Sequence, residues 1–374
     1  MIYIIIIFLP VLCAYFSDKS NKYVSLFFAL LAISFPIFFA GVRDASVGND
    51  VQVYATNLFK KATTLDFVSF MSFESVYHAF GINLLTWIVC RLNSFSIYLG
   101  FIQLLVIAPI FFFVYVKYPK NTWIAMAVYM LLLFPISLST MKQMIAVAWC
   151  FPCIGLLEKN KYKLVIFIVI LISMLIHMTA VFYLLIVPIF WLLKNLNSTK
   201  LNFLGNLRKY SPLILLFIYF IVLFIGAKFF INLLSGLKES YSFFLNTGKQ
   251  SINKSCLFMV LFLIFSLIVY SVKNKDKKIY WLFTHQQVFC VICIFAFSLF
   301  QLDMIANTLD RFAFYFLPFM TIYASSLLNT KPKKLKILLS LSNLIVLSIY
   351  FFVVCVLNTG YLIYPYTSKI LGIY

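Results

Sequence analysis

The chain has 374 residues, of which 64% are hydrophobic and only 11% are charged, and its mean hydropathy is +1.03. No water-soluble fold buries that much apolar surface, so the sequence predicts an all-α polytopic membrane protein, whose spans satisfy their backbone hydrogen bonds internally. The net charge of +20 is spread over connecting loops, and no basic domain stands apart from the apolar runs, which argues against a nucleic-acid-binding protein.

Apolar runs of near-spanning length follow one another along the chain, and they predict about 12 transmembrane helices. The runs are residues 1–16, 23–40, 95–116, 121–137, 142–157, 162–176, 178–193, 212–232, 256–272, 279–300, 311–329 and 335–356. The first run lacks the basic start and the small-residue cleavage site of a signal peptide, so we expect a retained helix. The sequence therefore predicts one integral membrane domain over residues 1–374.

Most of the 30 Lys and Arg residues lie in short loops that alternate along the chain and therefore fall on one side of the membrane. These loops are residues 17–22, 117–120, 158–163, 194–211, 273–278 and 330–336. The positive-inside rule makes that side cytoplasmic. The external side then holds His177, both chain ends and the segments 41–94, 138–141, 233–255 and 301–310.

The segment 72–94 does not fit this alternation as a full span, because a crossing there would place the later lysine loops outside. Its apolar core is short and is preceded by Glu74, His78, Gly81 and Asn83. We therefore expect an interfacial or re-entrant helix near 74–92, within the external segment 41–94. The alternative is a true span combined with a different assignment of another run.

A set of unusual polar groups falls on the external side in this topology, and charge beside a membrane span is costly enough to indicate a site. The set is Arg43, Asp44, Asp50, Tyr54, Glu74, His78, Lys142, Gln143, His177, Asp303, Asp310 and Arg311. Arg43, Lys142 and Arg311 are cations suited to a diphosphate, since arginine binds phosphate in a fork and lysine acts as a point charge. Taken alone, Arg43 or Arg311 also fits a side chain that reaches from the span to the interface.

The same external set contains candidate general bases, namely His177, Asp50 and Glu74. His177 is the first choice, because the ordinary pKa of imidazole, about 6.5, lies nearest to working pH. A structural role for His177 at a helix break is the alternative. Tyr54 and Tyr315 are candidates for stacking on sugar rings.

Sequence motifs for nucleotide binding, serine hydrolysis and zinc peptidases are absent, as is the Rossmann glycine pattern, so the sequence predicts no cofactor. The Asp44–Asp50 spacing and the two Cys-x-x-Cys pairs are weak metal signals, and we predict no metal site. An external site also has no supply of ATP or nucleotide sugars. Energy for synthesis there must arrive in a lipid-linked donor.

Several short motifs appear in the order and spacing of the EpsG family of polysaccharide-biosynthesis membrane proteins, which are related to Wzy-type O-antigen and capsule polymerases, and the chain resembles that family. The motifs are Gly41-Val-Arg43, Gly48-Asn-Asp50 with Tyr54, Glu74 before a short helix, Lys142-Gln143-x-x-Ala146, His177-Met-Thr-Ala180, and Asp310-Arg311 through Tyr315-Phe316. Two residues depart from the family's N-x-x-R-Q element, because Ser139 and Lys142 stand in place of its Asn and Arg. Lys142 keeps the charge but loses the bidentate fork.

The resemblance implies a GT-C-like helical fold and a metal-independent glycosyltransferase. The enzyme would join oligosaccharide repeat units carried on undecaprenyl diphosphate, at the outer face of the bacterial cytoplasmic membrane, with the active site facing the periplasm or exterior. Arg43, Arg311 and Lys142 would bind the diphosphate, and Gln143, Tyr54, Asp310 and Tyr315 would contact the substrate. Membrane lipids and a chain-length regulator are the implied partners.

Two other functions remain open at this point. An O-antigen ligase-like glycosyltransferase would use the same diphosphate clamp and the same kind of base. A flippase of lipid-linked oligosaccharides would share the apolar bulk and basic charge, but it predicts charges near mid-membrane and a pseudo-repeat between halves. Neither of these two features is evident in the sequence.

Overall fold

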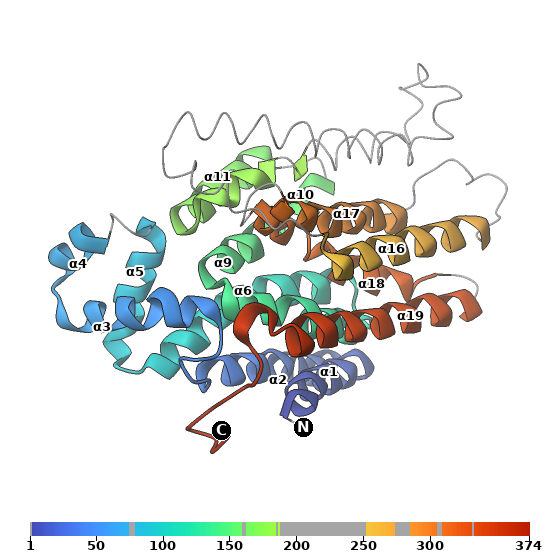
Figure 1. Cartoon of the computed structure of the whole chain (residues 1–374). Coiled ribbons are helices and arrows are strands. Elements are labelled where there is room, and N and C mark those ends of the chain that lie inside the picture. Colours follow the sequence, from blue (N-terminus) through green and yellow to red (C-terminus); the bar gives the residue numbers. More distant parts are fainter. Residues whose placement is uncertain are drawn as a thin grey trace. The chain divides into compact units, whose positions relative to one another are not determined.

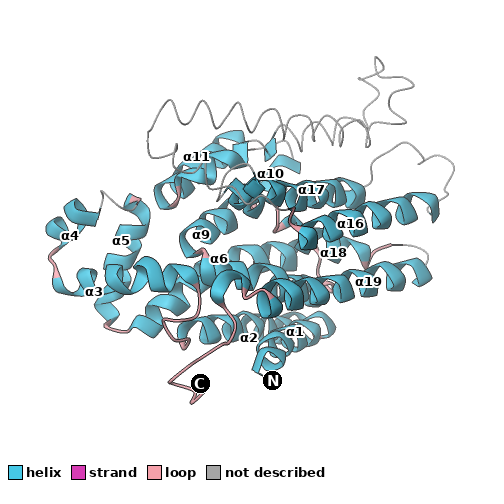
Figure 2. Cartoon of the chain, in the orientation of Figure 1, coloured by secondary structure: helices cyan, strands magenta, loops and turns pink. Residues whose placement is uncertain are grey.

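A computed structural model describes residues 2–74, 79–158, 162–184, 186–187, 252–273, 285–304, 309–330 and 333–374. In these ranges the chain is helical apart from its connections and contains no β-sheet (Figure 2). Seven helical segments within the described ranges are long and apolar enough to span a membrane. They are Ile2–Lys19, Lys22–Gly41, Phe95–Lys117, Thr122–Ser139, Met141–Glu158, Gln286–Asp303 and Lys333–Leu357. The protein is an all-α, multi-pass membrane protein, as the composition predicts.

The described chain forms two compact units. Unit 1 comprises Met1–Leu184, Ala324–Asn329 and Ser340–Tyr374, and unit 2 comprises Leu185–Tyr323 and Thr330–Leu339. The helices of unit 1 are α1 (Ile2–Lys19), α2 (Lys22–Gly41), η1 (Val51–Ala55), α3 (Thr56–Thr64), α4 (Phe67–Glu74), α5 (Phe80–Val89), η2 (Cys90–Leu92), α6 (Phe95–Lys117), α7 (Thr122–Val128), η3 (Tyr129–Leu133), α8 (Phe134–Ser139), α9 (Met141–Cys150), α10 (Cys153–Glu158), α11 (Lys163–Ile176), η4 (Met178–Phe182), η10 (Phe352–Leu357) and η11 (Gly360–Leu362).

Unit 2 contains α16 (Lys254–Lys273), α17 (His285–Leu299), η8 (Phe300–Met304) and η9 (Leu309–Tyr315). Two helices, α18 (Phe319–Leu327) and α19 (Lys333–Phe351), run from unit 2 into unit 1. The predicted run 311–329 is thus divided between η9 and α18, with Pro318 between them. The predicted span 212–232 and most of the loop 233–255 lie outside the described residues, so the helix count of about 12 and the GT-C-like fold stay predictions.

In unit 1 the first long helices pack as antiparallel neighbours, and α1 and α2 lie side by side (Figure 1). Ser17 near the end of α1 donates to the carbonyl of Ser25 near the start of α2, at 2.9 Å. The end of α2 lies against the start of α6, because a Cβ added at Gly41 would meet the carbonyl oxygen of Ser96 at 2.9 Å. At the opposite end of this pair, the Ser25 and Tyr115 hydroxyls are 2.9 Å apart.

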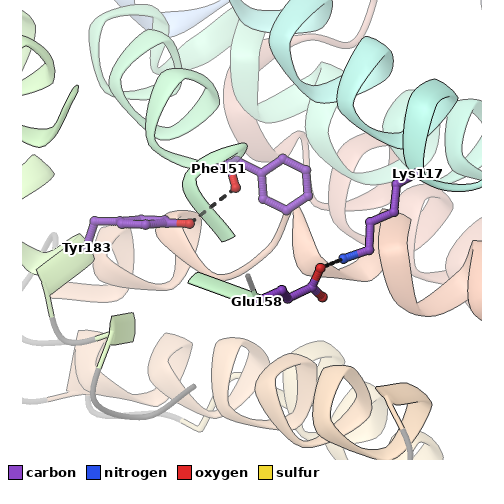
Figure 3. A network of polar contacts seen from close by, with 4 residues as sticks. All are labelled: Lys117, Phe151, Glu158 and Tyr183. Carbon is purple, nitrogen blue, oxygen red and sulfur yellow. Dashed lines mark hydrogen bonds and ion pairs between the residues drawn. The ribbon is translucent and has the colours of Figure 1, made fainter. Parts of the chain in front are cut away.

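The lysine-bearing loops of unit 1 gather at one end of these helices. The Asp18 carboxylate accepts the backbone N–H groups of Thr122 and Trp123, at 3.2 and 3.0 Å, and so joins the first loop to the start of α7. Lys117 at the end of α6 forms an ion pair with Glu158 at the end of α10 (Figure 3). This grouping agrees with the alternation of loops read from the sequence.

The other end of unit 1 carries the loop after α2 and a group of short helices, η1, α3, α4, α5 and η2. Tyr98, near the start of α6, joins several of them. Its ring lies 5.5 Å from that of Phe59 on α3, and its hydroxyl lies 3.1 Å from that of Thr86 on α5. None of these five helices is long enough to cross a membrane. The interfacial or re-entrant placement of 74–92 stays a prediction.

Candidate functional site

The loop that follows α2, residues 42–50, has its shape set by Gly48. This residue has φ +96°, and a Cβ there would lie 2.2 Å from the carbonyl oxygen of Leu138 on α8. Only glycine fits such a close approach with a positive φ. The loop therefore rests directly on the end of α8, which Thr140 connects to α9.

Arg43 lies in this loop and is 5% exposed. Its Nη2 lies 3.2 Å from the sulfur of Met141, which is a weak acceptor. Its Nε and Nη1 have no hydrogen-bond partner among the described residues. Burial lowers the pKa of Arg43 to about 10, against opposing contributions from Tyr366, Asp50 and Tyr54. The guanidinium is therefore a buried cation that remains protonated at neutral pH, and the described part of the chain supplies it with no oxygen acceptor.

Asp50, Tyr54 and Lys142 form a second part of the same site. The Tyr54 hydroxyl donates to the Asp50 carboxylate at 2.8 Å, and Lys142 Nζ lies over the Tyr54 ring, 4.0 Å from its centroid. Burial, followed by the charge of Asp50, raises the pKa of Tyr54 well above its usual value. The phenol therefore stays neutral and donates its hydrogen bond to Asp50. The ring presents its negative face to the lysine.

Two chain segments far apart in sequence meet here, because α9 begins with Met141, Lys142 and Gln143 beside the loop after α2. Gln143 is buried, with 2% of its surface exposed. The structure thus brings together four residues that the sequence proposed, Arg43, Asp50, Tyr54 and Lys142. Met141 was missed, since a methionine in an apolar run carries no sequence signal.

His177 directly follows α11 and has an extended backbone, with φ −152° and ψ 116°. Its Nδ1 lies 2.6 Å from the Thr179 hydroxyl, so the threonine of the His177-Met-Thr-Ala180 motif orients the imidazole. The following η4 is joined to the end of α9, because the Tyr183 hydroxyl donates to the carbonyl of Phe151 at 3.3 Å (Figure 3). The α11 helix packs against both α9 and α5. A site shared by His177 with Arg43 and Lys142 stays a prediction.

The other candidate residues lie elsewhere. Glu74 ends α4, and His78 lies outside the described residues. Asp310 and Arg311 lie half-buried in η9 of unit 2, and Tyr315 is fully buried at the end of the same helix. A shared site for Arg43 and Arg311 therefore stays a prediction. Among the described residues, no group of three or more His, Cys, Asp or Glu side chains could hold a metal ion.

The sequence also missed the C-terminal tail, residues 360–374, as part of this region. Tyr366 donates to the carbonyl of Phe39 at 2.7 Å, and Ser368 donates to the carbonyl of Val42 at 2.5 Å. Lys369 N–H donates to the Asp44 carboxylate at 3.0 Å. The tail follows the last span without a recognisable motif, so no local pattern indicated where it docks.

Comparison with known proteins places the chain in a family. No curated protein and no solved structure is significantly similar to it. The sequence model of the EpsG family matches residues 26–368, a range that contains the loop after α2, the start of α9, the His177 motif and η9. With nearly the whole chain matched, the protein belongs to the EpsG family.

Proposed function

We propose that the protein is a polysaccharide polymerase that joins oligosaccharide repeat units carried on undecaprenyl diphosphate. Membership of the EpsG family supports a polymerase of the glycosyltransferase type in a membrane. The lipid-linked donor, the position of the reaction and the roles of individual residues are our proposal.

The observation that carries the proposal is the state of Arg43. Within the described ranges, the Nε and Nη1 of this buried guanidinium have no partner, which is costly because burial removes its water without supplying acceptors. A phosphate oxygen pair is the acceptor whose geometry a guanidinium matches in a fork. Lys142, 4.0 Å from the Tyr54 ring centroid and next in sequence to Met141, adds a second cation to this region. The site is thus built for an anion, and a lipid diphosphate supplies one.

The chemistry follows from these groups. A hydroxyl oxygen of the acceptor repeat unit attacks the anomeric carbon of the growing chain, and the bond from that carbon to the diphosphate oxygen breaks. The hydroxyl proton passes to His177, whose ring is oriented by Thr179. If the His177 Nδ1 donates to the Thr179 hydroxyl, the nitrogen that accepts the proton is Nε2. Undecaprenyl diphosphate leaves with its charge met by Arg43, which stays protonated throughout. Asp50 or Glu74 is the alternative base.

We further propose that the Arg43 end of unit 1 faces the periplasm or exterior and that the lysine-bearing end faces the cytoplasm. The support is the positive-inside rule, together with the gathering of the first lysine-bearing loops at the end opposite the Arg43 loop. Arg311 and Lys142 complete the diphosphate clamp in this proposal. Membrane lipids and a chain-length regulator are the other partners.

Replacement of Arg43 by Lys tests the role of the fork. We expect loss of at least 90% of the polymer, about a tenfold effect or more, because lysine keeps the charge but not the paired donors. Arg91→Lys is the matched control, since Arg91 is exposed and its guanidinium carbon stacks 4.1 Å from the Trp87 ring centroid, outside the site. Polymer would be read as a glycan ladder, with membrane insertion checked by immunoblot. Wild-type polymer from an inserted Arg43→Lys protein would refute the clamp.

A deletion strain distinguishes the polymerase from the two other functions. Loss of polymer with single repeat units retained on the surface supports a polymerase. Loss of all surface glycan would instead favour a ligase-like transferase or a flippase.

A further inference from the structure

The C-terminal tail, residues 360–374, runs back along the loop that carries Arg43 (Figure 1). Two backbone hydrogen bonds join them, from Gly48 N–H to the Leu362 carbonyl at 2.7 Å and from Asp44 N–H to the Thr367 carbonyl at 3.0 Å. A third backbone group, the Val42 carbonyl, accepts the Ser368 hydroxyl at 2.5 Å. The tail therefore supplies partners to backbone groups on both sides of Arg43.

The loop has little structure of its own to keep it in place. Its internal backbone bond, from Val47 N–H to the Asp44 carbonyl at 3.0 Å, closes one turn. Buried backbone groups require partners, and here the partners come from a segment about 320 residues later in the chain. The loop also meets α8, where Gly48 packs on the Leu138 carbonyl. The loop is thus held by contacts with both α8 and the tail.

The tail is anchored independently of the loop. The Tyr366 ring lies 6.3 Å from that of Phe39 and 6.3 Å from that of Tyr3 on α1, and Tyr3 also donates to the Ile363 carbonyl. These contacts attach the tail to the ends of α1 and α2. Because the tail is attached to these spans, its hydrogen bonds to the loop can hold the loop in place relative to them.

The Arg43 guanidinium lies close to this junction, because a Cβ built at Gly48 would lie 3.6 Å from its Nη1. We propose that the C-terminal tail is a positioning element of the Arg43 site, with Asp44 and Ser368 as its positioning residues. The inference rests on the proposed function, since it gives the tail the role of holding Arg43 for the lipid diphosphate. Asp44 then acts as a hydrogen-bond acceptor for Lys369 N–H, and its charge is not required.

Two substitutions at Asp44 distinguish its role as a hydrogen-bond acceptor from its role as a negative charge. Asp44→Asn keeps the Oδ1 that accepts from Lys369 N–H but removes the charge, whereas Asp44→Ala removes both. Ser368→Ala removes the donor to Val42. The matched control is Ser348→Ala, because Ser348 is exposed on α19 and its hydroxyl donates within its own helix, to the Leu344 carbonyl at 2.9 Å.

Binding of undecaprenyl diphosphate to the purified full-length protein is the functional readout. We expect Asp44→Ala and Ser368→Ala each to raise Kd about five- to tenfold, which corresponds to one lost hydrogen bond. Asp44→Asn and Ser348→Ala should stay within about twofold of the wild type. An Asp44→Asn protein that binds as poorly as Asp44→Ala would overturn the proposal, because Asp44 would then act through its charge.

A second readout does not depend on the proposed function. Val47 is 1% exposed in the loop, and all eight native cysteines are buried, so Val47→Cys provides a reporter thiol. We expect a water-soluble maleimide to label this thiol at least fivefold faster when Asp44→Ala or Ser368→Ala is added. Labelling at the unaltered rate would show that the tail does not hold the loop, whichever ligand the site binds. Unchanged lipid diphosphate binding by Arg43→Lys, together with accelerated labelling, would instead refute the proposed function and leave the tail's hold on the loop supported.

Discussion

Gly48→Ala adds one methyl group at the point where the Arg43 loop rests on α8. The new Cβ would lie 2.2 Å from the Leu138 carbonyl oxygen and 2.9 Å from its carbon. Both are backbone atoms, so no side-chain rotation relieves the collision. Restoring an ordinary contact requires a displacement of about 1 Å.

If the loop stays in place, the cost has two sources. A positive φ costs about 1–2 kcal/mol for an L-residue, and overpacking at a rigid contact costs about 1–3 kcal/mol, so the sum is roughly 2–5 kcal/mol. Movement of the loop would relieve the overlap but strain the Gly48 N–H bond to Leu362, which is worth about 0.5–1.5 kcal/mol. If the loop moves instead, Arg43 moves with it, and a 1 Å displacement in a site reduces the rate about 100-fold.

Polymerisation of a lipid-linked repeat unit by reconstituted protein, with thermal unfolding in detergent, measures both outcomes. Gly100→Ala is the control for an added methyl group, since its nearest contact is 3.5 Å. A Gly48→Ala protein with the wild-type rate and unfolding temperature would refute the reasoning from the loop geometry.

Three further predictions concern Thr179, Tyr54 and Arg43. Thr179→Val should lower the rate about tenfold by freeing the His177 ring, whereas Thr179→Ser should retain most activity; equal rates for the two variants would show that the 2.6 Å contact has no role. Tyr54→Phe keeps the ring beneath Lys142 and should retain more activity than Tyr54→Leu, which removes both ring and hydroxyl; the opposite ranking would exclude a contribution from the cation–π contact. The pKa of Arg43, lowered by burial to about 10, means that the cost of the buried charge is fully present below pH 10 and is relieved as pH rises above it. Affinity for undecaprenyl diphosphate should therefore be constant from pH 7 to 9 and fall above about pH 10, and for Arg43→Lys it should fall at lower pH, because burial lowers the pKa of lysine from about 10.4. A wild-type affinity that falls between pH 7 and 9 would contradict this assignment.

Part of the site was readable from the sequence because its signals are local. Arg43, Asp50, Tyr54 and Lys142 stand out since a charged group next to a long apolar run is rare and costly. The lysines of alternating loops, which orient spans one by one, predict that these residues lie on one side of the membrane. The first lysine-bearing loops do meet at one end of unit 1, through Asp18 and through the pair Lys117–Glu158. The predicted site shared with Arg311 stays a prediction, because Arg311 belongs to unit 2.

The sequence by itself therefore determined the helical membrane class, the approximate limits of the described spans and the residues most worth testing, because hydropathy and charge act over a few neighbouring residues. Tertiary structure decided which of these residues meet and what each one contacts. The Lys142–Tyr54 contact, the sulfur of Met141 beside Arg43 and the docking of Ser368 on Val42 join segments about 90 to 330 residues apart. No periodicity or motif encodes such pairs, since they arise when helices pack and loops find partners for their buried backbone groups.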